Sequence, residues 1–248
     1  MTSSELLAKV DGLRAGRIPF VLATVVRAER PTSARPGDRA LVLPDGTMEG
    51  FVGGSCAQST VLDQGLRLLA AGESTLLRIT PAAGESPAPA AGVITVGNPC
   101  HSGGSLEIFL ESVLPPTLIH VTGDSPVARA LVRVGEALDY EVEATIDPQA
   151  PIEPDTEALV VAAHGENEHQ VLLAALNAGV PYVGLIASPR RGAAVLAGLD
   201  LPDEQRSRVH TPAGLDIGAR TATEVALSVY ADLVARRRAR DASDIGAG

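Results

Sequence analysis

The sequence has only two cysteines, no long apolar segment and fewer basic than acidic residues. The two cysteines are Cys56 and Cys100, and the sequence shows no export signal. A disulfide framework is therefore not expected. The two thiols are either inert and buried or used in chemistry or ligation. Basic residues number 20 against 30 acidic ones, for a formal net charge of −10. Because this charge repels nucleic acid and anionic membrane surfaces, the sequence predicts no nucleic-acid partner.

The N-terminal segment lacks the features of a targeting sequence. Glu5 and Asp11 stand where a signal peptide would carry a basic region and an apolar run, and no apolar stretch approaches membrane-spanning length. We therefore expect a cytoplasmic protein without a membrane span. The 248 residues, of which 45% are hydrophobic, suffice for two domains with cores of their own.

Apolar periodicity predicts an α/β domain over residues 1–114. A short amphipathic helix at 4–15 precedes a strand at 20–26, and the turn signal at 44–46 joins two short strands near Leu41 and Met48. After residues 53–56, a helical pattern runs through Val61 and Leu69 to about Gly72, and a further strand is predicted at 106–110. The Pro/Ala/Gly-rich stretch at 81–92 is predicted to be a long, mobile or partly disordered loop.

Beyond Pro115 and Pro116 the pattern changes to alternating strands and helices. The apolar runs lie at 117–121, 142–146, 158–162 and 182–186. They predict a Rossmann-like domain with a doubly wound parallel sheet over residues 115–240. A last helix, predicted at 221–238, begins with a capping box formed by Thr221 and Glu224, and residues 241–248 are predicted to be a frayed tail.

Two segments that combine glycine with cysteine are the strongest candidates for a binding site. Gly53, Gly54, Ser55 and Cys56 lie at a predicted strand-to-helix turn, where glycine permits close approach of a ligand and helix amides favour an anion or a thiolate. The second segment repeats the combination with Cys100, Gly103 and Gly104. We expect the two loops to converge on one ligand, with plain tight turns as the alternative. A zinc site lacks the usual Cys-x-x-Cys spacing.

The predicted Rossmann-like domain has weaker nucleotide-binding signals. Gly123 keeps only the first of the three fingerprint glycines, while Ser125 stands where glycine is normally required. Asp147 has the position of a ribose-binding acid, and Arg190 offers a cation for phosphate. The second hypothesis is therefore an NAD(P)-dependent oxidoreductase, although NAD(P) itself is disfavoured because Asp124 and Ser125 crowd and repel a pyrophosphate. A scaffold that binds no small molecule is a third hypothesis.

Four blocks of the sequence resemble the XdhC/CoxI family, accessory proteins of xanthine dehydrogenase and carbon monoxide dehydrogenase. These blocks are residues 23–62, 100–111, 182–191 and 212–235. The resemblance implies a maturation chaperone, rather than an enzyme, that binds molybdenum cofactor, protects it during sulfuration by a cysteine desulfurase and inserts it into an apo molybdenum hydroxylase. The cofactor form, molybdopterin or its cytosine dinucleotide, and the formation of a homodimer stay open.

The resemblance also implies residue roles. The family's first cysteine loop matches Gly53, Gly54 and Cys56, with Ser55 between them; its second matches Cys100, Gly103 and Gly104; and its basic loop matches Arg35, Pro36 and Gly37. Cys56 and Cys100 are the expected contacts of the molybdenum, because a soft thiolate can hold or shield that metal.

Overall fold

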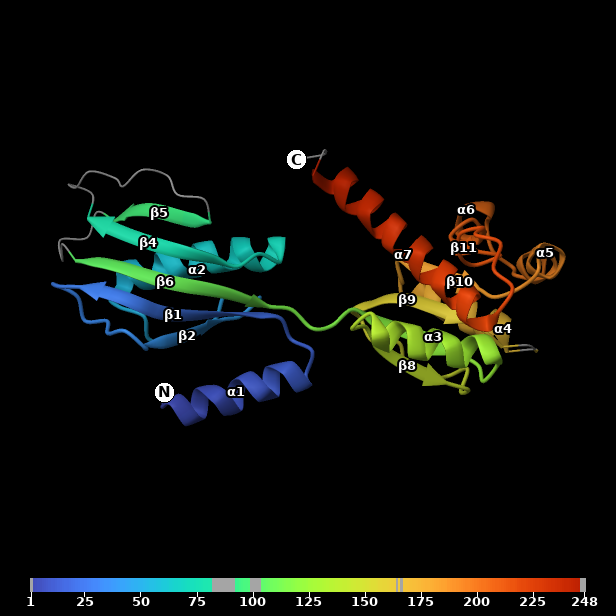
Figure 1. Ribbon diagram of the computed structural model, residues 1–248, viewed down its shortest axis with the longest axis horizontal. Helices are drawn as coiled ribbons and strands as arrows, with labels where there is room; N and C mark the ends of the chain where they lie inside the picture. The colour runs from blue at the N-terminus through green and yellow to red at the C-terminus, as the bar shows by residue number, and fades with distance from the viewer. Residues whose placement is uncertain (1, 82–91, 99–103, 164, 166, 246–248) are drawn as a thin grey trace. The chain divides into compact units, whose positions relative to one another are not determined.

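A computed structural model describes residues 2–81, 92–98, 104–163, 165 and 167–245, and it divides the chain into two compact units (Figure 1). Unit 1 is Met1–Pro115 and unit 2 is Pro116–Gly248. Each unit has its own β-sheet. Most of the predicted loop at 81–92 lies outside the described residues. Within the described part of the chain, no helix has the length and apolarity needed to cross a membrane.

Unit 1 is a six-stranded sheet in the order β3-β2-β1-β6-β4-β5. Its strands are β1 (Phe20–Glu29), β2 (Arg39–Val42), β3 (Met48–Gly50), β4 (Thr75–Pro81), β5 (Val93–Asn98) and β6 (Ser105–Val113), and its helices are α1 (Ser3–Ala15) and α2 (Ser55–Ala71). Strands β4 and β5 pair in parallel, whereas the other neighbouring strands are antiparallel. The unit is therefore an α/β domain with a mixed sheet.

The two helices of unit 1 cover opposite faces of the sheet, because side chains alternate along a strand. Val21, Ala23 and Val25 of β1 belong to the core that includes α2. Phe20 and Leu41 belong to a second core, formed with α1. Both faces near the start of β1 are thus buried.

Several strand ends meet at one edge of the unit 1 sheet. Glu29, the last residue of β1, pairs with Ser105, the first residue of β6. Leu106 pairs with Ile79, near the carboxyl end of β4, and β5 ends beside β4. We call this the loop edge of unit 1. The loops that follow β1 and precede β6 both start there.

Unit 2 is a five-stranded parallel sheet in the order β11-β10-β9-β7-β8. Its strands are β7 (Leu118–Thr122), β8 (Glu141–Thr145), β9 (Thr156–Val161), β10 (Tyr182–Leu185) and β11 (Val209–His210). Its helices are α3 (Pro126–Ala137), α4 (Glu168–Asn177), α5 (Pro189–Ala197), α6 (Asp203–Arg206) and α7 (Ala222–Ile245). Helices α3 and α7 pack on one face and α4 and α5 on the other, so the predicted doubly wound Rossmann-like sheet is confirmed.

Helix α7 begins with the predicted capping box but ends later than expected. The Thr221 amide donates to Glu224 Oε2 at 2.9 Å, and the Glu224 amide donates to Thr221 Oγ1 at 3.3 Å. The helix then continues to Ile245, past the predicted boundary at residue 240. The predicted frayed tail is therefore helical over much of its length, and residues 246–248 lie outside the described part of the chain.

Candidate functional site

At position 53, in the first predicted cysteine loop, both the backbone conformation and the packing require glycine. Its φ is +134°, a conformation that residues other than glycine rarely adopt. A Cβ at this position would lie 3.1 Å from Ala57 Cβ, 3.3 Å from Leu106 Cδ1 and 3.7 Å from Ala34 Cβ. The turn before α2 therefore packs against the start of β6 and against the residue that precedes Arg35.

The start of α2 has no side-chain cap. Gly54 is the N-cap residue, no side chain accepts a hydrogen bond from the first amides, and the first turn contains no acidic residue. Ser55 is exposed and Cys56 is half-buried at the first two helical positions. Because a helix start carries partial positive charge, this one favours an anionic ligand.

Arg35 and Gly104 join the same edge from two other loops. The Arg35 amide donates to Asp38 Oδ2 at 2.7 Å, and the Arg35 side chain is exposed. At Gly104 a Cβ would lie 2.7 Å from the carbonyl oxygen of Glu29, so the chain passes too close to β1 for any larger residue. The structure thus brings Gly53, Arg35 and Gly104 to the loop edge of unit 1.

The predicted thiol pair is described only in part. Cys56 is disulfide-bonded, which differs from the expectation of free thiols. Cys100 and Gly103 lie outside the described residues. The described His, Cys, Asp and Glu residues form no group of three that could hold a metal ion. Contact of both sulfurs with a molybdenum centre therefore stays a prediction.

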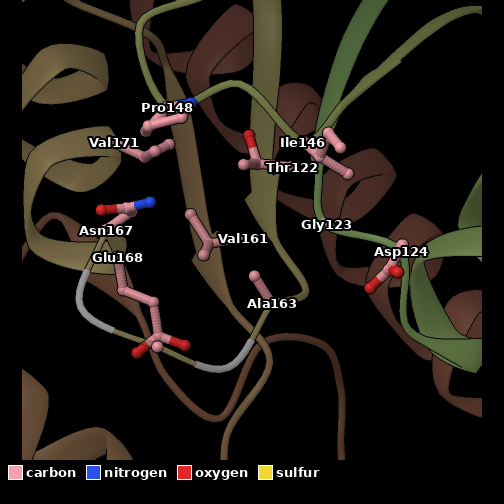
Figure 2. A pocket seen from close by; sticks show the side chains of 11 residues that line it. Thr122, Gly123, Asp124, Ile146, Pro148, Val161, Ala163, Asn167, Glu168 and Val171 are labelled. Atoms are coloured by element: carbon pink, nitrogen blue, oxygen red, sulfur yellow. The ribbon is translucent and has the colours of Figure 1, made fainter.

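Unit 2 has a cavity at the point where its strand order reverses. From β7 the chain continues to β8 on one side and later to β9 on the other, and ligands of such sheets bind in the crevice at this switch point. The cavity has a volume of about 210 Å³ (Figure 2). It is lined by Thr122, Gly123, Asp124, Ile146, Pro148, Val161, Ala163, Gly165, Asn167, Glu168 and Val171. We call it the switch-point cavity.

Gly123 contributes to this cavity through its backbone conformation and not through a polar side chain. Its φ is +124°, and a Cβ would lie 2.7 Å from the carbonyl oxygen of Ala162. The segments that follow β7 and β9 are therefore in direct backbone contact. The predicted glycine is needed here for this contact, whatever ligand the cavity takes.

Two polar side chains of the cavity are almost completely buried. Thr122 is 7% exposed. Glu168 is 4% exposed, and its Oε1 accepts a hydrogen bond from the Arg191 guanidinium. Figure 2 shows these side chains, together with Asn167, around the cavity.

Ser125 and Asp147 do not line the switch-point cavity. Ser125 caps α3 by accepting a hydrogen bond from the Ala128 amide at 3.1 Å, and Pro126 next to it has no N–H. Asp147 Oδ1 accepts from the Gln149 amide at 2.9 Å. Both side chains are thus engaged in hydrogen bonds with their own segments.

Arg191, rather than the predicted Arg190, takes part in a buried interaction. Arg190 is exposed on α5, whereas Arg191 pairs with Glu168 and donates to the carbonyl oxygen of Ile186 at 3.3 Å. Arg191 also lines a second cavity, of about 790 Å³, beside the start of α5. Sequence order alone cannot separate two adjacent arginines, because the difference arises from the direction in which each side chain leaves the helix.

A parallel, doubly wound sheet with a cavity at its switch point defines unit 2 as a Rossmann-like domain. Comparison with known proteins agrees with this class: the XdhC Rossmann domain matches residues 119–233, and the XdhC and CoxI family matches residues 13–80. The two matches lie in different units and together cover most of the sequence. The chain belongs to the XdhC and CoxI family.

Two relatives illustrate the range of similarity. The protein YqeB of Escherichia coli (strain K12) is 25% identical over 258 residues, which are 93% of this chain and 46% of YqeB. The chain thus spans about half the length of this curated relative. The crystal structure of a xanthine dehydrogenase from Bacillus halodurans is similar over 97% of both chains, with 17% identity and a TM-score of 0.45.

Proposed function

We propose that this protein is a maturation factor that binds molybdenum cofactor and inserts it into a molybdenum hydroxylase such as xanthine or carbon monoxide dehydrogenase. Membership of the XdhC and CoxI family supports an accessory role for such a dehydrogenase. The observation that carries the cofactor-binding part is the meeting of Arg35, Gly53 and Gly104 at the loop edge of unit 1, beside the uncapped start of α2.

The donor groups at this edge fit the chemistry of the cofactor. Molybdopterin carries phosphate and metal-bound oxygens, for which the exposed Arg35 guanidinium and the α2 amides are suitable donors. When bound, the cofactor would supply the molybdenum centre. Arg35 and the α2 amides would bind and orient its anionic part, and Cys56, once reduced, would offer a soft ligand for the metal.

The proposed role needs no turnover by this chain. In the cytoplasm, the protein shields the cofactor while a cysteine desulfurase adds the terminal sulfur, and it then releases the cofactor to the apo-hydroxylase. The NAD(P)-dependent alternative has less support, because Ser125 caps the helix start that would face a pyrophosphate and Asp147 is bonded to its own loop.

The test is cofactor loading of the full-length protein under reducing conditions. Bound cofactor is measured after desalting, as the fluorescence of its oxidised pterin. Substitution of Arg35 by Ala removes charge-assisted hydrogen bonds and should lower the affinity about tenfold. Arg67→Ala is the matched control, because Arg67 is exposed near the other end of α2 and pairs with Asp63 at 3.3 Å. It should load like the wild type.

The same assay tests the cysteine and the delivery step. Cys56→Ala should lose cofactor more rapidly on dilution and should activate less apo-hydroxylase than the wild type does. If Arg35→Ala and Cys56→Ala both load and deliver like Arg67→Ala, the loop edge of unit 1 is not the cofactor site. If the wild type itself loads no cofactor, the proposed function is wrong.

A further inference from the structure

Helix α7 carries a stripe of residues on the side that faces away from the core of unit 2. The core side of the helix, which lies beside α3 (Figure 1), includes Val229, Tyr230 and Leu233. On the other side, three- and four-residue spacing places five residues on one face of the helix. We call these five residues the α7 stripe: Glu224, Leu227, Ala231, Val234 and Arg238.

The middle of the α7 stripe is apolar and open to solvent. Leu227 is 53% exposed and Val234 is 44% exposed, with the half-buried Ala231 between them. The loop before α7 adds two more exposed apolar side chains, Leu215 and Ile217. This loop is fixed beside the helix, because the Leu215 amide donates to a backbone carbonyl of α7 at 3.1 Å. Apolar surface that gathers in this way is typical of an interaction site.

The two ends of the α7 stripe carry opposite charges. Hydrogen bonds from two backbone amides at the helix start lower the pKa of Glu224, so its carboxylate is charged. At the other end, Arg236 and Arg240 pair with acidic residues of unit 2, whereas Arg238 is exposed and forms no ion pair with a described residue. Arg238 is therefore a cation available to an acidic group of another molecule.

The order of these residues makes the α7 stripe complementary to itself. Glu224 and Arg238 lie equally far from Ala231, at about 10 Å along the helix axis on either side. When two such helices run antiparallel around a two-fold axis at Ala231, each Glu224 faces Arg238 of the other copy. Leu227 then meets Val234 of the other copy, and the small side chain of Ala231 allows the helices to approach closely.

We propose that the α7 stripe is the contact of a symmetric dimer, in which α7 of one chain packs antiparallel against α7 of a second copy. The contact of two helices is smaller than the roughly 1,600 Å² of a standard interface, so the dimer should dissociate in the micromolar range. The inference goes beyond the proposed function. It concerns a surface of unit 2 and is tested without any molybdenum compound, so its failure and that of cofactor loading are separate results.

The first experiment measures the molar mass of the full-length protein by sedimentation equilibrium over a range of concentrations. The wild type should approach twice the mass of one 25.4 kDa chain as the concentration rises. Leu227→Glu should weaken association about tenfold or more, because an unpaired carboxylate would be buried between the helices. Leu7→Glu is the matched control, since Leu7 is 54% exposed on α1 of unit 1. It should associate like the wild type.

Arg238→Glu tests the charged ends of the stripe in the same experiment. It places like charges opposite each other at both ends of the contact and should weaken association roughly three- to tenfold. Arg190→Glu changes the net charge equally on α5, which packs on the other face of the sheet, and should have no such effect. A wild type that stays monomeric at all concentrations would overturn the proposal. Association of the Leu227 and Arg238 variants equal to that of their controls would do the same.

The second experiment tests the antiparallel register. Ala231→Cys places two thiols at the proposed two-fold axis, within reach of a disulfide bond, so oxidation with diamide should join two chains covalently. Thr223→Cys is the control, because its two thiols would lie about 24 Å apart along the helices and should stay unlinked. The wild type, oxidised in parallel, accounts for the native cysteines, and thermal unfolding checks that each variant is folded. Absence of the Ala231→Cys link in a protein that dimerises, or equal linking of Thr223→Cys, would overturn the α7 contact.

Discussion

Gly53 and Gly54 are adjacent in sequence but have different physical roles. A Cβ on Gly53 would contact Ala57 and Leu106, and its φ of +134° is unfavourable for other residues. Gly54 has a φ of −65°, and a Cβ there would meet nothing within 4 Å. From the sequence pattern alone, both glycines are predicted to serve the same tight turn.

This difference predicts unequal effects of alanine at the two positions. Gly53→Ala should lower the free energy of unfolding of unit 1 by about 2 kcal/mol, because backbone strain and crowding both oppose the folded state. Gly54→Ala should cost less than about 1 kcal/mol, since only the preference for glycine over alanine at an N-cap is lost. Urea unfolding followed by circular dichroism measures both. Equal losses would contradict this account of the turn.

At the scale of elements, the start of α2 differs from the starts of α3 and α5. Helix α2 begins without a side-chain cap, whereas Ser125 and Ser188 cap α3 and α5, each followed by proline. A cap occupies amides that an anion would otherwise use. The start of α2 is therefore better suited to an anion than the starts of α3 and α5.

Strands β10 and β11 are tied to α7 through a buried polar cluster. Tyr182 on β10 donates to Asp232 Oδ2 on α7 at 3.1 Å, and its ring stacks on His210 of β11 with 4.8 Å between centroids. Burial raises the pKa of Tyr182, so its phenol stays protonated and continues to donate. Burial and, to a lesser extent, the charge of Arg236 lower the pKa of His210 below its ordinary value.

The lowered pKa of His210 predicts a loss of stability in mild acid. The unfolded chain binds a proton at the ordinary pKa of 6.5, whereas folded His210 resists protonation. Its contribution to stability is therefore fully present above pH 6.5 and is lost as the pH falls toward the lowered folded value. His210→Phe keeps an aromatic ring on Tyr182 and should flatten this part of the pH dependence of unit 2 unfolding in urea. An unchanged pH dependence would show that other groups cause it.

At the scale of the whole molecule, the chain consists of two units with separate sheets and separate cores. The proposed cofactor site depends on loops of unit 1. Each unit buries its own apolar residues, as an independently folding domain must.

Fragments 1–115 and 116–248 should therefore each unfold cooperatively when produced alone. The first fragment should compete for molybdenum cofactor, and the second should not. Circular dichroism with urea unfolding and the cofactor-loading assay check these expectations. A fragment that lacks a cooperative transition would show that the two units depend on each other for folding.

Much of unit 2 could be predicted because its strands are buried on both faces. Such strands appear in the sequence as runs of apolar residues. The bounds of β7 and β10 differ little from the runs predicted at 117–121 and 182–186. The capping box of Thr221 and Glu224 was also predictable, because its partners are three residues apart. Strands β4 and β5 were not predicted. Arg78 interrupts the apolar pattern of β4, and it is accommodated there by a 3.0 Å ion pair with Glu107 of β6.

The amino-acid order by itself determined which segments are helices and most of the strands, the Rossmann-like character of unit 2 and the need for glycine near the cysteine loop, because these depend on local periodicity and backbone preference. Only the tertiary structure decided that Thr122 and Glu168 are polar groups of a cavity, that Ser125 is a helix cap and that Arg191 rather than Arg190 is engaged. Burial and partner choice depend on residues that are distant in sequence, and no local pattern records them.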